Sequence, residues 1–135
     1  MEKYYIDKEI KVFYVTATSF PEGVGGAFKK LLSFLPKPNK RILFALSSPN
    51  EKGIIIYRAA VEESFPGEGK QNGCEIFVIK KGHYWSELLL DWRKDESIIG
   101  RTFQKLLKHP NLDKNCYCLE IYSNEKDVRC LVPLL

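Results

Sequence analysis

The sequence has no long hydrophobic run, and none of its apolar stretches approaches the roughly 18 residues that a membrane-spanning helix needs. Its first residues, Met1-Glu2-Lys3-Tyr4, lack the apolar stretch and the small-residue cleavage site of a signal peptide. We therefore expect a cytoplasmic protein that does not bind a membrane.

The sequence also lacks a strong excess of charge of one sign. It has 21 basic and 17 acidic residues, a formal net charge of +4. The basic pairs, such as Lys29-Lys30 and Lys80-Lys81, alternate with acidic or apolar neighbours and form no basic stripe. This pattern argues against direct binding of nucleic acid.

Residues typical of catalytic and metal sites are few. The only two histidines, His83 and His109, each adjoin a turn residue, and the sequence contains no nucleophile elbow, phosphate-binding loop, dinucleotide fingerprint or zinc-protease motif. Cys116 and Cys118 would share a strand face without the turn of a zinc knuckle, and no CxxC pair is present. We predict no metal, no cofactor, no assigned catalytic residue and four reduced cysteines.

What the sequence does have is the composition of a globular domain. Of its 135 residues, 44% are hydrophobic and 13% aromatic, enough for one compact core. We expect a single domain over residues 1–135.

The first half alternates strand and helix patterns. Residues 11–18 are β-branched and aromatic, and residues 21–35 place apolar side chains at helical spacing until Pro36. Residues 41–48 and 53–62 then predict a hairpin, and residues 64–73 have the glycine and polar content of a linker.

The second half repeats this order. Residues 74–80 predict a strand and residues 82–86 a turn into a helix. That helix is expected to run from Ser86 to about Lys108, with a break near residues 95–97. A second hairpin follows, formed by residues 116–123 and 127–133.

The two halves therefore indicate an internal repeat, repeat 1 at about 8–63 and repeat 2 at about 74–135. The alignment places Phe13 on Phe77, Phe20 on Tyr84, and Asn50-Glu51-Lys52 on Asn124-Glu125-Lys126. Two strand-helix-strand-strand units can join their edges, so we predict an α+β fold: one antiparallel sheet with two long helices on one face. The groove between the helices is a natural site for a small ligand.

One strand of the second repeat carries an unexpected acid. Glu120 lies in an apolar run and shares a face with Cys118 and Tyr122, whereas repeat 1 has Ala45 at its position. A carboxylate on the floor of an apolar groove is costly to desolvate but attracts a cationic or hydrogen-bond-donating ligand. The alternative is an ordinary exposed carboxylate on the sheet.

Aromatic side chains are the expected walls of such a site, because ring faces attract cations. With Glu120 we predict as ligand-binding residues Tyr14, Phe20, Tyr57, Tyr84, Trp85, Trp92 and Tyr122. Trp92 is also compatible with a plain core position. An enzyme would use Glu120 as the base or proton carrier and a tyrosine hydroxyl to orient water or substrate.

Three short segments carry a family resemblance: Ile79-Lys80-Lys81-Gly82-His83-Tyr84, Leu119-Glu120-Ile121-Tyr122 and Leu131-Val132-Pro133-Leu134. In this order they resemble the GyrI-like small-molecule-binding domains, which are also the effector-binding domains of AraC-type and MerR-type transcription regulators. The resemblance implies a duplicated strand-helix-strand-strand fold, with Glu120 as the acid of the groove and Tyr84 and Tyr122 as the matched tyrosines. The acid and tyrosine that the family often carries in its last strand are missing here.

The resemblance leads us to expect a stand-alone effector-binding domain that binds a small organic molecule, drug-like and cationic or aromatic, for sensing or sequestration. Some relatives resemble hydrolases of reactive small molecules that use Glu and Tyr, so a hydrolase is the alternative. A gyrase-inhibitor-like module that binds a protein partner is the other.

Overall fold

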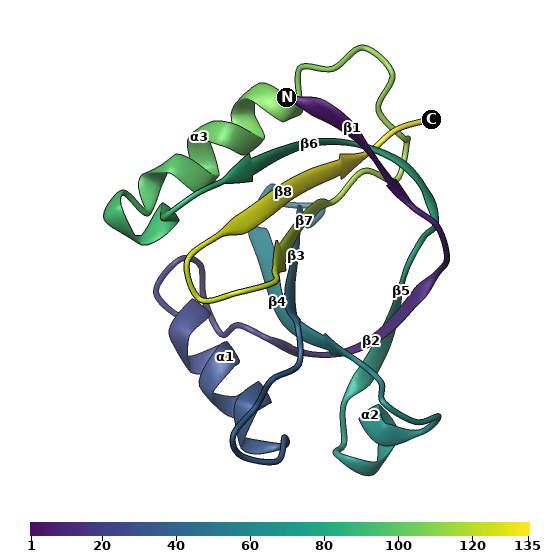
Figure 1. Ribbon diagram of the computed structural model, residues 1–135, viewed down its shortest axis with the longest axis vertical. Coiled ribbons are helices and arrows are strands. Elements are labelled where there is room, and N and C mark those ends of the chain that lie inside the picture. The colour runs from purple at the N-terminus through teal and green to yellow at the C-terminus, as the bar shows by residue number, and fades with distance from the viewer.

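The computed structural model describes residues 1–135 as one curled antiparallel sheet with helices packed outside it (Figure 1). The predicted α+β class is confirmed. The strands are β1 (Glu2–Ile6), β2 (Ile10–Thr16), β3 (Leu43–Pro49), β4 (Ile55–Glu62), β5 (Glu75–Ile79), β6 (Gly82–Leu89), β7 (Cys118–Tyr122) and β8 (Val128–Pro133). The helices are α1 (Val24–Ser33), the short α2 (Glu68–Gln71), the 3-10 turn η1 (Trp92–Lys94) and α3 (Ser97–Leu106).

The eight strands lie in the order β1-β6-β8-β7-β3-β4-β2-β5. The two halves of the chain meet where β3 pairs with β7, with Ala45 opposite Glu120. At the edges the halves exchange strands, because β1 pairs with β6 and β5 pairs with β2. The middle of the sheet is therefore built from both halves of the chain.

Side-chain alternation gives the sheet two buried faces. The concave face holds a core that includes Val12, Phe44, Tyr84 and Leu131. The convex face carries the helices: residues such as Phe13 and Val61 turn that way and pack on α1. The strands are thus apolar on both sides along much of their length.

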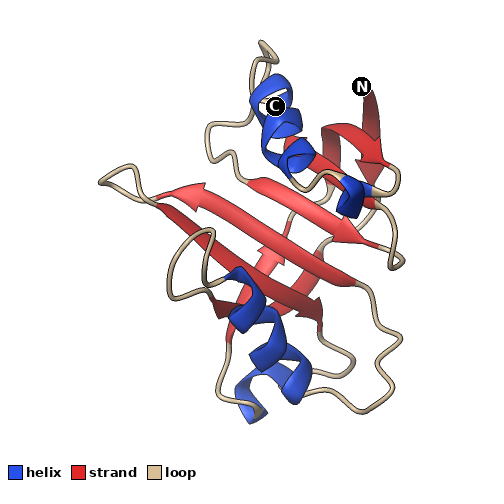
Figure 2. Cartoon of the chain, turned by 90° about the vertical axis from the view of Figure 1, so that its left-hand side faces the viewer, coloured by secondary structure: helices blue, strands red, loops and turns tan.

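Both longer helices cover the same convex face, as predicted. In α1, Ala27 and Leu31 lie one turn apart and pack on β4, where Ala59 leaves room for the helix to approach. In α3, Phe103 and Leu106 pack on β8. Figure 2 views this face and shows strands crossing the space between the two helices. No helix has the length and hydrophobicity needed to cross a membrane.

The prediction of a helix from Ser86 to Lys108 is wrong at its start. Residues 82–89 form strand β6, and α3 begins at Ser97, just after the expected break. Tyr84 faces the concave core while Trp85 and Leu89 face α3, so β6 is apolar on both faces. A continuous apolar run of this kind does not distinguish a buried strand from a helix.

The alignment of Phe13 with Phe77 and of Phe20 with Tyr84 does not describe the structure. Phe77 and Tyr84 lie on the successive strands β5 and β6, whereas Phe20 lies in the irregular segment that leads into α1. The sequence analysis predicted no strand at residues 2–6. Strand β1 lies at the edge of the sheet, and only Ile6 of its five residues is buried.

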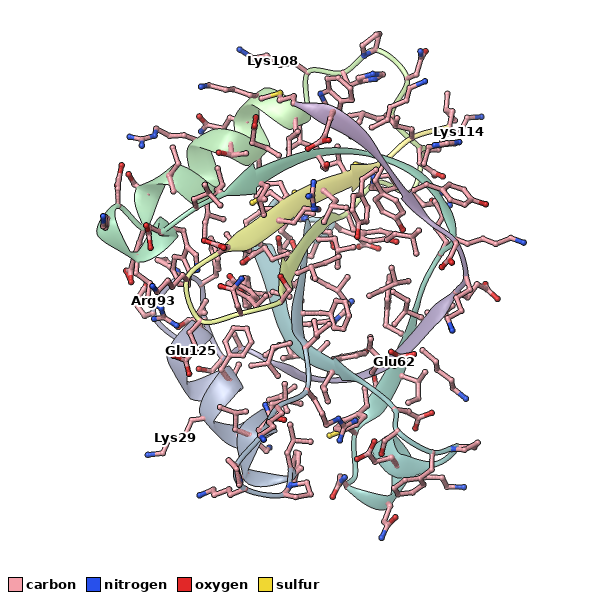
Figure 3. The ribbon with its side chains drawn as sticks, in the orientation of Figure 1. Lys29, Glu62, Arg93, Lys108, Lys114 and Glu125 are labelled. Carbon is pink, nitrogen blue, oxygen red and sulfur yellow. The ribbon has the colours of Figure 1, made fainter.

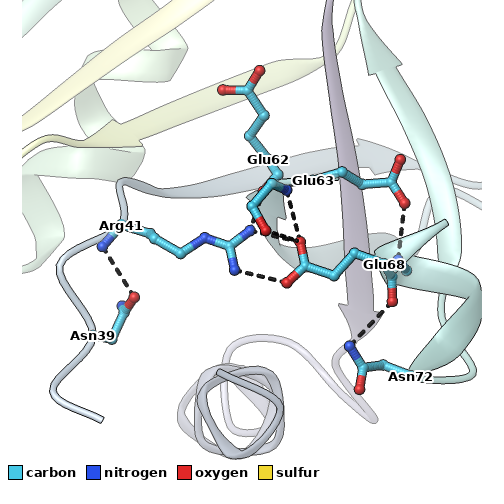
Figure 4. Close-up of polar contacts among 8 residues, drawn as sticks. Asn39, Arg41, Glu62, Glu63, Glu68 and Asn72 are labelled. Atoms are coloured by element: carbon cyan, nitrogen blue, oxygen red, sulfur yellow. Dashed lines mark hydrogen bonds and ion pairs between the residues drawn. The ribbon is translucent and has the colours of Figure 1, made fainter. Parts of the chain in front are cut away.

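An ion pair fastens the segment between the two halves to the rest of the sheet (Figure 4). Arg41 donates to both carboxylate oxygens of Glu68, at 2.8 and 2.9 Å, and also to the main-chain oxygen of Glu62. The amide of Ser64 donates to Glu68 at 2.8 Å. The Arg41 hydrogen bonds lower the pKa of Glu68 to about 2, although burial opposes them.

We predict that Glu68→Gln lowers the free energy of unfolding at neutral pH by about 1–3 kcal/mol, because it removes a charge-assisted pair. The depressed pKa means that this stabilisation is present above about 4.5, the ordinary pKa, and is lost as the pH falls toward 2. Urea unfolding at a series of pH values measures the difference. Glu51→Gln, an exposed turn carboxylate, is the control. If the difference in free energy of unfolding between the wild type and E68Q does not become smaller in acid, this account is wrong.

Candidate functional site

Glu120 occupies the centre of the convex face. Its neighbours on the flanking strands are Ala45 on β3 and Cys130 on β8. Only 4% of Glu120 is exposed, so the carboxyl lies beneath the space between the helices and not on an open sheet surface. The alternative of an ordinary exposed carboxylate on the sheet is therefore wrong.

Two tyrosine hydroxyls hold the Glu120 carboxyl. Tyr57 on β4 donates to Oε1 at 3.2 Å, and Tyr122 on β7 donates to the same oxygen. None of the ion pairs in the structure includes Glu120. Burial raises the pKa of Glu120, and the two hydroxyls oppose that rise. The same burial, with the nearby carboxyl, raises the pKa of both tyrosines, which stay protonated donors.

Aromatic rings surround this triad. Phe20 stacks on Tyr57 with ring centroids 5.5 Å apart. Phe28 of α1 makes edge contacts with Tyr57 at 6.3 Å and with Tyr122 at 6.1 Å. Trp92 of η1 contacts Tyr122 at 5.7 Å. The walls of the site thus come from the segment before α1, from α1 itself and from η1.

The turn between β7 and β8 positions Trp92. Asp91 has a left-handed backbone, φ 51°, which turns the chain sharply after β6. The amide of Trp92 then donates to Lys126 O at 3.2 Å, and Arg93 Nε donates to Glu125 O at 3.2 Å. Figure 3 labels Arg93 and Glu125, which lie together between α1 and α3. The hairpin that carries Glu120 therefore also anchors the tryptophan that stands beside it.

Tyr84 lies on the opposite face of the sheet, which corrects its assignment to the site. It is fully buried in the concave core, donates to Lys80 O at 2.7 Å and lies 2.7 Å from the Tyr117 hydroxyl. The assignment was wrong because residues 82–86 were expected to form a helix start at the rim of the groove. In strand β6 this position faces inward.

Tyr14 and Trp85 also lie outside the cluster. Tyr14 packs against the concave core and donates to Glu75 Oε2 at 2.8 Å. Trp85 is on the convex face, but its ring lies against His109, with centroids 4.9 Å apart. The structure therefore brings together Glu120, Tyr122, Tyr57, Phe20 and Trp92 of the predicted set.

Phe28 is the site residue that the sequence reasoning missed. Its helical spacing with Leu31, Leu32 and Leu35 identified it only as part of an apolar stripe. The spacing placed Phe28 on the apolar side of the helix, but a residue at the edge of the site has the same spacing as a core residue. The distinction required the position of α1 relative to Glu120.

Of two open cavities, only one is lined by a residue of the site, Trp92. One, of about 440 Å³, lies at the end of β6 and is lined by residues that include Leu90, Trp92 and Ile98. The other, of about 310 Å³, lies beside α1 and is lined by residues that include Lys30, Phe34 and Cys74. Neither cavity is lined by Glu120.

The two thiols near Glu120 are neutral. Burial raises the pKa of Cys118 to about 12 and raises that of Cys130 as well, so both thiols stay protonated. No group of three or more His, Cys, Asp or Glu side chains is assembled in a way that could hold a metal ion. The chemistry available at the site is a buried carboxyl, tyrosine hydroxyls and ring faces.

No protein-family model and no curated protein matches this sequence. Its fold is similar to that of several solved structures. SAV2435, in a structure with bound tetraphenylphosphonium, is 11% identical with a TM-score of 0.65, over 99% of this chain and 93% of that chain.

Two further structures show the same likeness. The integron cassette protein VCH_CASS2 from Vibrio cholerae is 12% identical with a TM-score of 0.71, over 99% of this chain and 95% of that chain. A hydrolase from Listeria innocua is 9% identical with a TM-score of 0.61, over 99% of this chain and 90% of that chain. At these identities the likeness shows the fold alone, and it supports the GyrI-like resemblance at that level.

We predict that Glu120→Gln makes the protein more stable than the wild type at neutral pH. A carboxyl whose pKa is raised on folding contributes stability below its ordinary value of 4.5, and that contribution is lost as the pH rises through the folded pKa. The E120Q advantage should therefore grow with pH, by about 1.4 kcal/mol per unit of pKa elevation. Thermal melts from acid to neutral pH measure it, with Glu62→Gln as the exposed control. A wild type that gains stability over E120Q as the pH rises would contradict the account.

Proposed function

We propose that this protein binds a lipophilic aromatic cation in the groove between α1 and the η1–α3 segment. The observation that carries this proposal is the Glu120 carboxyl, which is buried among aromatic rings and has no basic partner. A buried acid of this kind lacks a counter-charge, and a bound cation supplies one.

The walls of the site favour the same ligand class. The rings of Phe20, Phe28 and Trp92 provide apolar surface, and each contact of a cation with a ring face contributes about 0.5–2 kcal/mol. Besides Glu120, the tyrosines and the indole of Trp92, the polar side chains of this cluster are Ser47 on β3 and Arg93, whose guanidinium lies over the Trp92 ring. Affinity would thus depend on charge and apolar area and would tolerate ligands of varied shape.

A ligand would reach Glu120 by displacing Phe20. This ring is 46% exposed although it stacks on Tyr57, and it lies in the irregular segment before α1. Residues in such segments move more readily than those in a sheet. A planar ring of the ligand would then take the place of Phe20 on Tyr57.

The fold likeness supports this proposal. SAV2435 has been solved with tetraphenylphosphonium, a lipophilic aromatic cation. The GyrI-like resemblance of the sequence adds a purpose, sensing or sequestration of such a compound.

A specific observation favours hydrolysis as a second candidate. Glu120 and Tyr122 form a carboxyl–hydroxyl pair, and burial raises the pKa of the carboxyl toward the range of a general base. One of the structures with a similar fold is described as a hydrolase. In this role Glu120 would take a proton from water while Tyr122 orients it.

Calorimetric titration with tetraphenylphosphonium tests the binding proposal. We expect saturable binding by the wild type and a loss of roughly 10- to 150-fold in affinity in E120Q, the range of one charge-assisted interaction. Glu62→Gln removes the same charge from an exposed side chain that makes none of the contacts of the Glu120 cluster, and this variant should bind as the wild type does.

Equal affinity in E120Q and the wild type would refute the role of Glu120. No saturable binding of any lipophilic cation in a broad set would refute the function itself. Turnover of an ester or other reactive substrate that E120Q abolishes, with the fold intact, would favour the hydrolase.

A further inference from the structure

We infer that Glu120 Oε2 is the atom that accepts a hydrogen bond from the ligand, so that the site prefers protonated amines to quaternary cations of the same shape. This inference rests on the proposed function. It concerns the chemical class of the ligand, which the carboxyl charge alone does not determine.

The hydrogen bonds of Glu120 are distributed unevenly between its two oxygens. Tyr57 and Tyr122 both donate to Oε1, and no group of the protein donates to Oε2. A carboxylate oxygen has two lone pairs and is a strong acceptor. Oε1 is therefore satisfied by the protein, while Oε2 is left with its full capacity to accept.

Oε2 is also within reach of a ligand. The buried side-chain polar atoms that lack a partner are Arg58 Nε, Glu63 Oε1 and Trp92 Nε1. Since Oε2 has no partner and is not one of them, the 4% of Glu120 that remains exposed includes this oxygen. Part of the unpaired acceptor is therefore still accessible.

The side chains around Glu120 offer no alternative donor of comparable strength. Across the sheet it faces the methyl group of Ala45 and the thiol of Cys130, and Cys118 lies two residues away on the same strand. Both thiols are protonated and are weak donors. The indole N–H of Trp92 is buried without any acceptor, so it does not donate to Oε2. The guanidinium of Arg93 lies over the Trp92 ring, 4.7 Å from its centroid, but its Nε donates to Glu125 O and it forms no ion pair with Glu120.

The two classes of cation differ in what they do to this oxygen. A protonated amine carries an N–H that can form a short, charge-assisted hydrogen bond to Oε2. A quaternary ammonium ion carries the same charge but no donor, and its methyl groups would exclude water from Oε2 and leave it unpaired. An unpaired, desolvated acceptor lowers affinity.

A matched pair of probes tests this difference: N,N-dimethyl-1-naphthylmethylamine and the quaternary salt made from it by one N-methylation. Titrations near pH 7 keep the amine protonated, since alkylamines have a pKa of about 10. We expect the wild type to bind the amine more tightly by about tenfold or more. E120Q should lose this preference, and the exposed variant E62Q should keep it.

Equal or tighter binding of the quaternary salt by the wild type would overturn the inference, and so would a preference for the amine that persists in E120Q. Both results leave the proposed function intact if the two probes bind in the groove. Binding of neither probe, together with no binding of tetraphenylphosphonium, would overturn both. The wild-type comparison needs no variant, so it does not depend on the folding of E120Q.

Discussion

A carboxyl group lies in the middle of the convex face of the sheet, and two tyrosine hydroxyls are its only hydrogen-bond donors. The pairing of β3 with β7 makes this arrangement possible. Tyr57 comes from β4, and its hydroxyl must cross β3 to reach Glu120 on β7. The residues of β3 beneath that path are Ala45 and Ser47, which are small enough to let the ring lie across them. The pairing of β3 with β7, which joins the two halves of the chain, thus also forms the floor of the site.

The two faces of the sheet differ in what packs against them: a hydrophobic core fills the concave face, and helices cover the convex face. The concave face is filled by a core that includes Phe44, Tyr84 and Leu131. On the convex face, α1 and α3 pack over different strands, and the β3–β7 pair lies between them. There the rings of Phe28 on α1 and Trp92 on η1 pack against Tyr122. Beneath these rings lies a carboxyl that takes part in none of the ion pairs of the structure.

Alternation along a strand was enough to predict where Glu120 and Tyr122 point, because a two-residue period needs no knowledge of the tertiary fold. The helical stripe likewise predicted α1. The expected position of Tyr84 was wrong because alternation could not be read from its segment. Its segment is apolar on both faces, and only the pairing of β6 with β1 and β8 shows that it is a strand. Phe28 could not be separated from the core stripe, since a groove wall and a core residue have the same spacing until the helix is placed on the sheet.

The central claim is that Glu120 and its aromatic walls form the ligand site. A crystal structure of the protein with a lipophilic aromatic cation tests this claim most directly. The account predicts density between α1 and η1, with the cationic centre beside the Glu120 carboxyl and Phe20 displaced from Tyr57. Density on the concave face beside Tyr84 and Tyr117, with the Phe20 stack undisturbed, would contradict it.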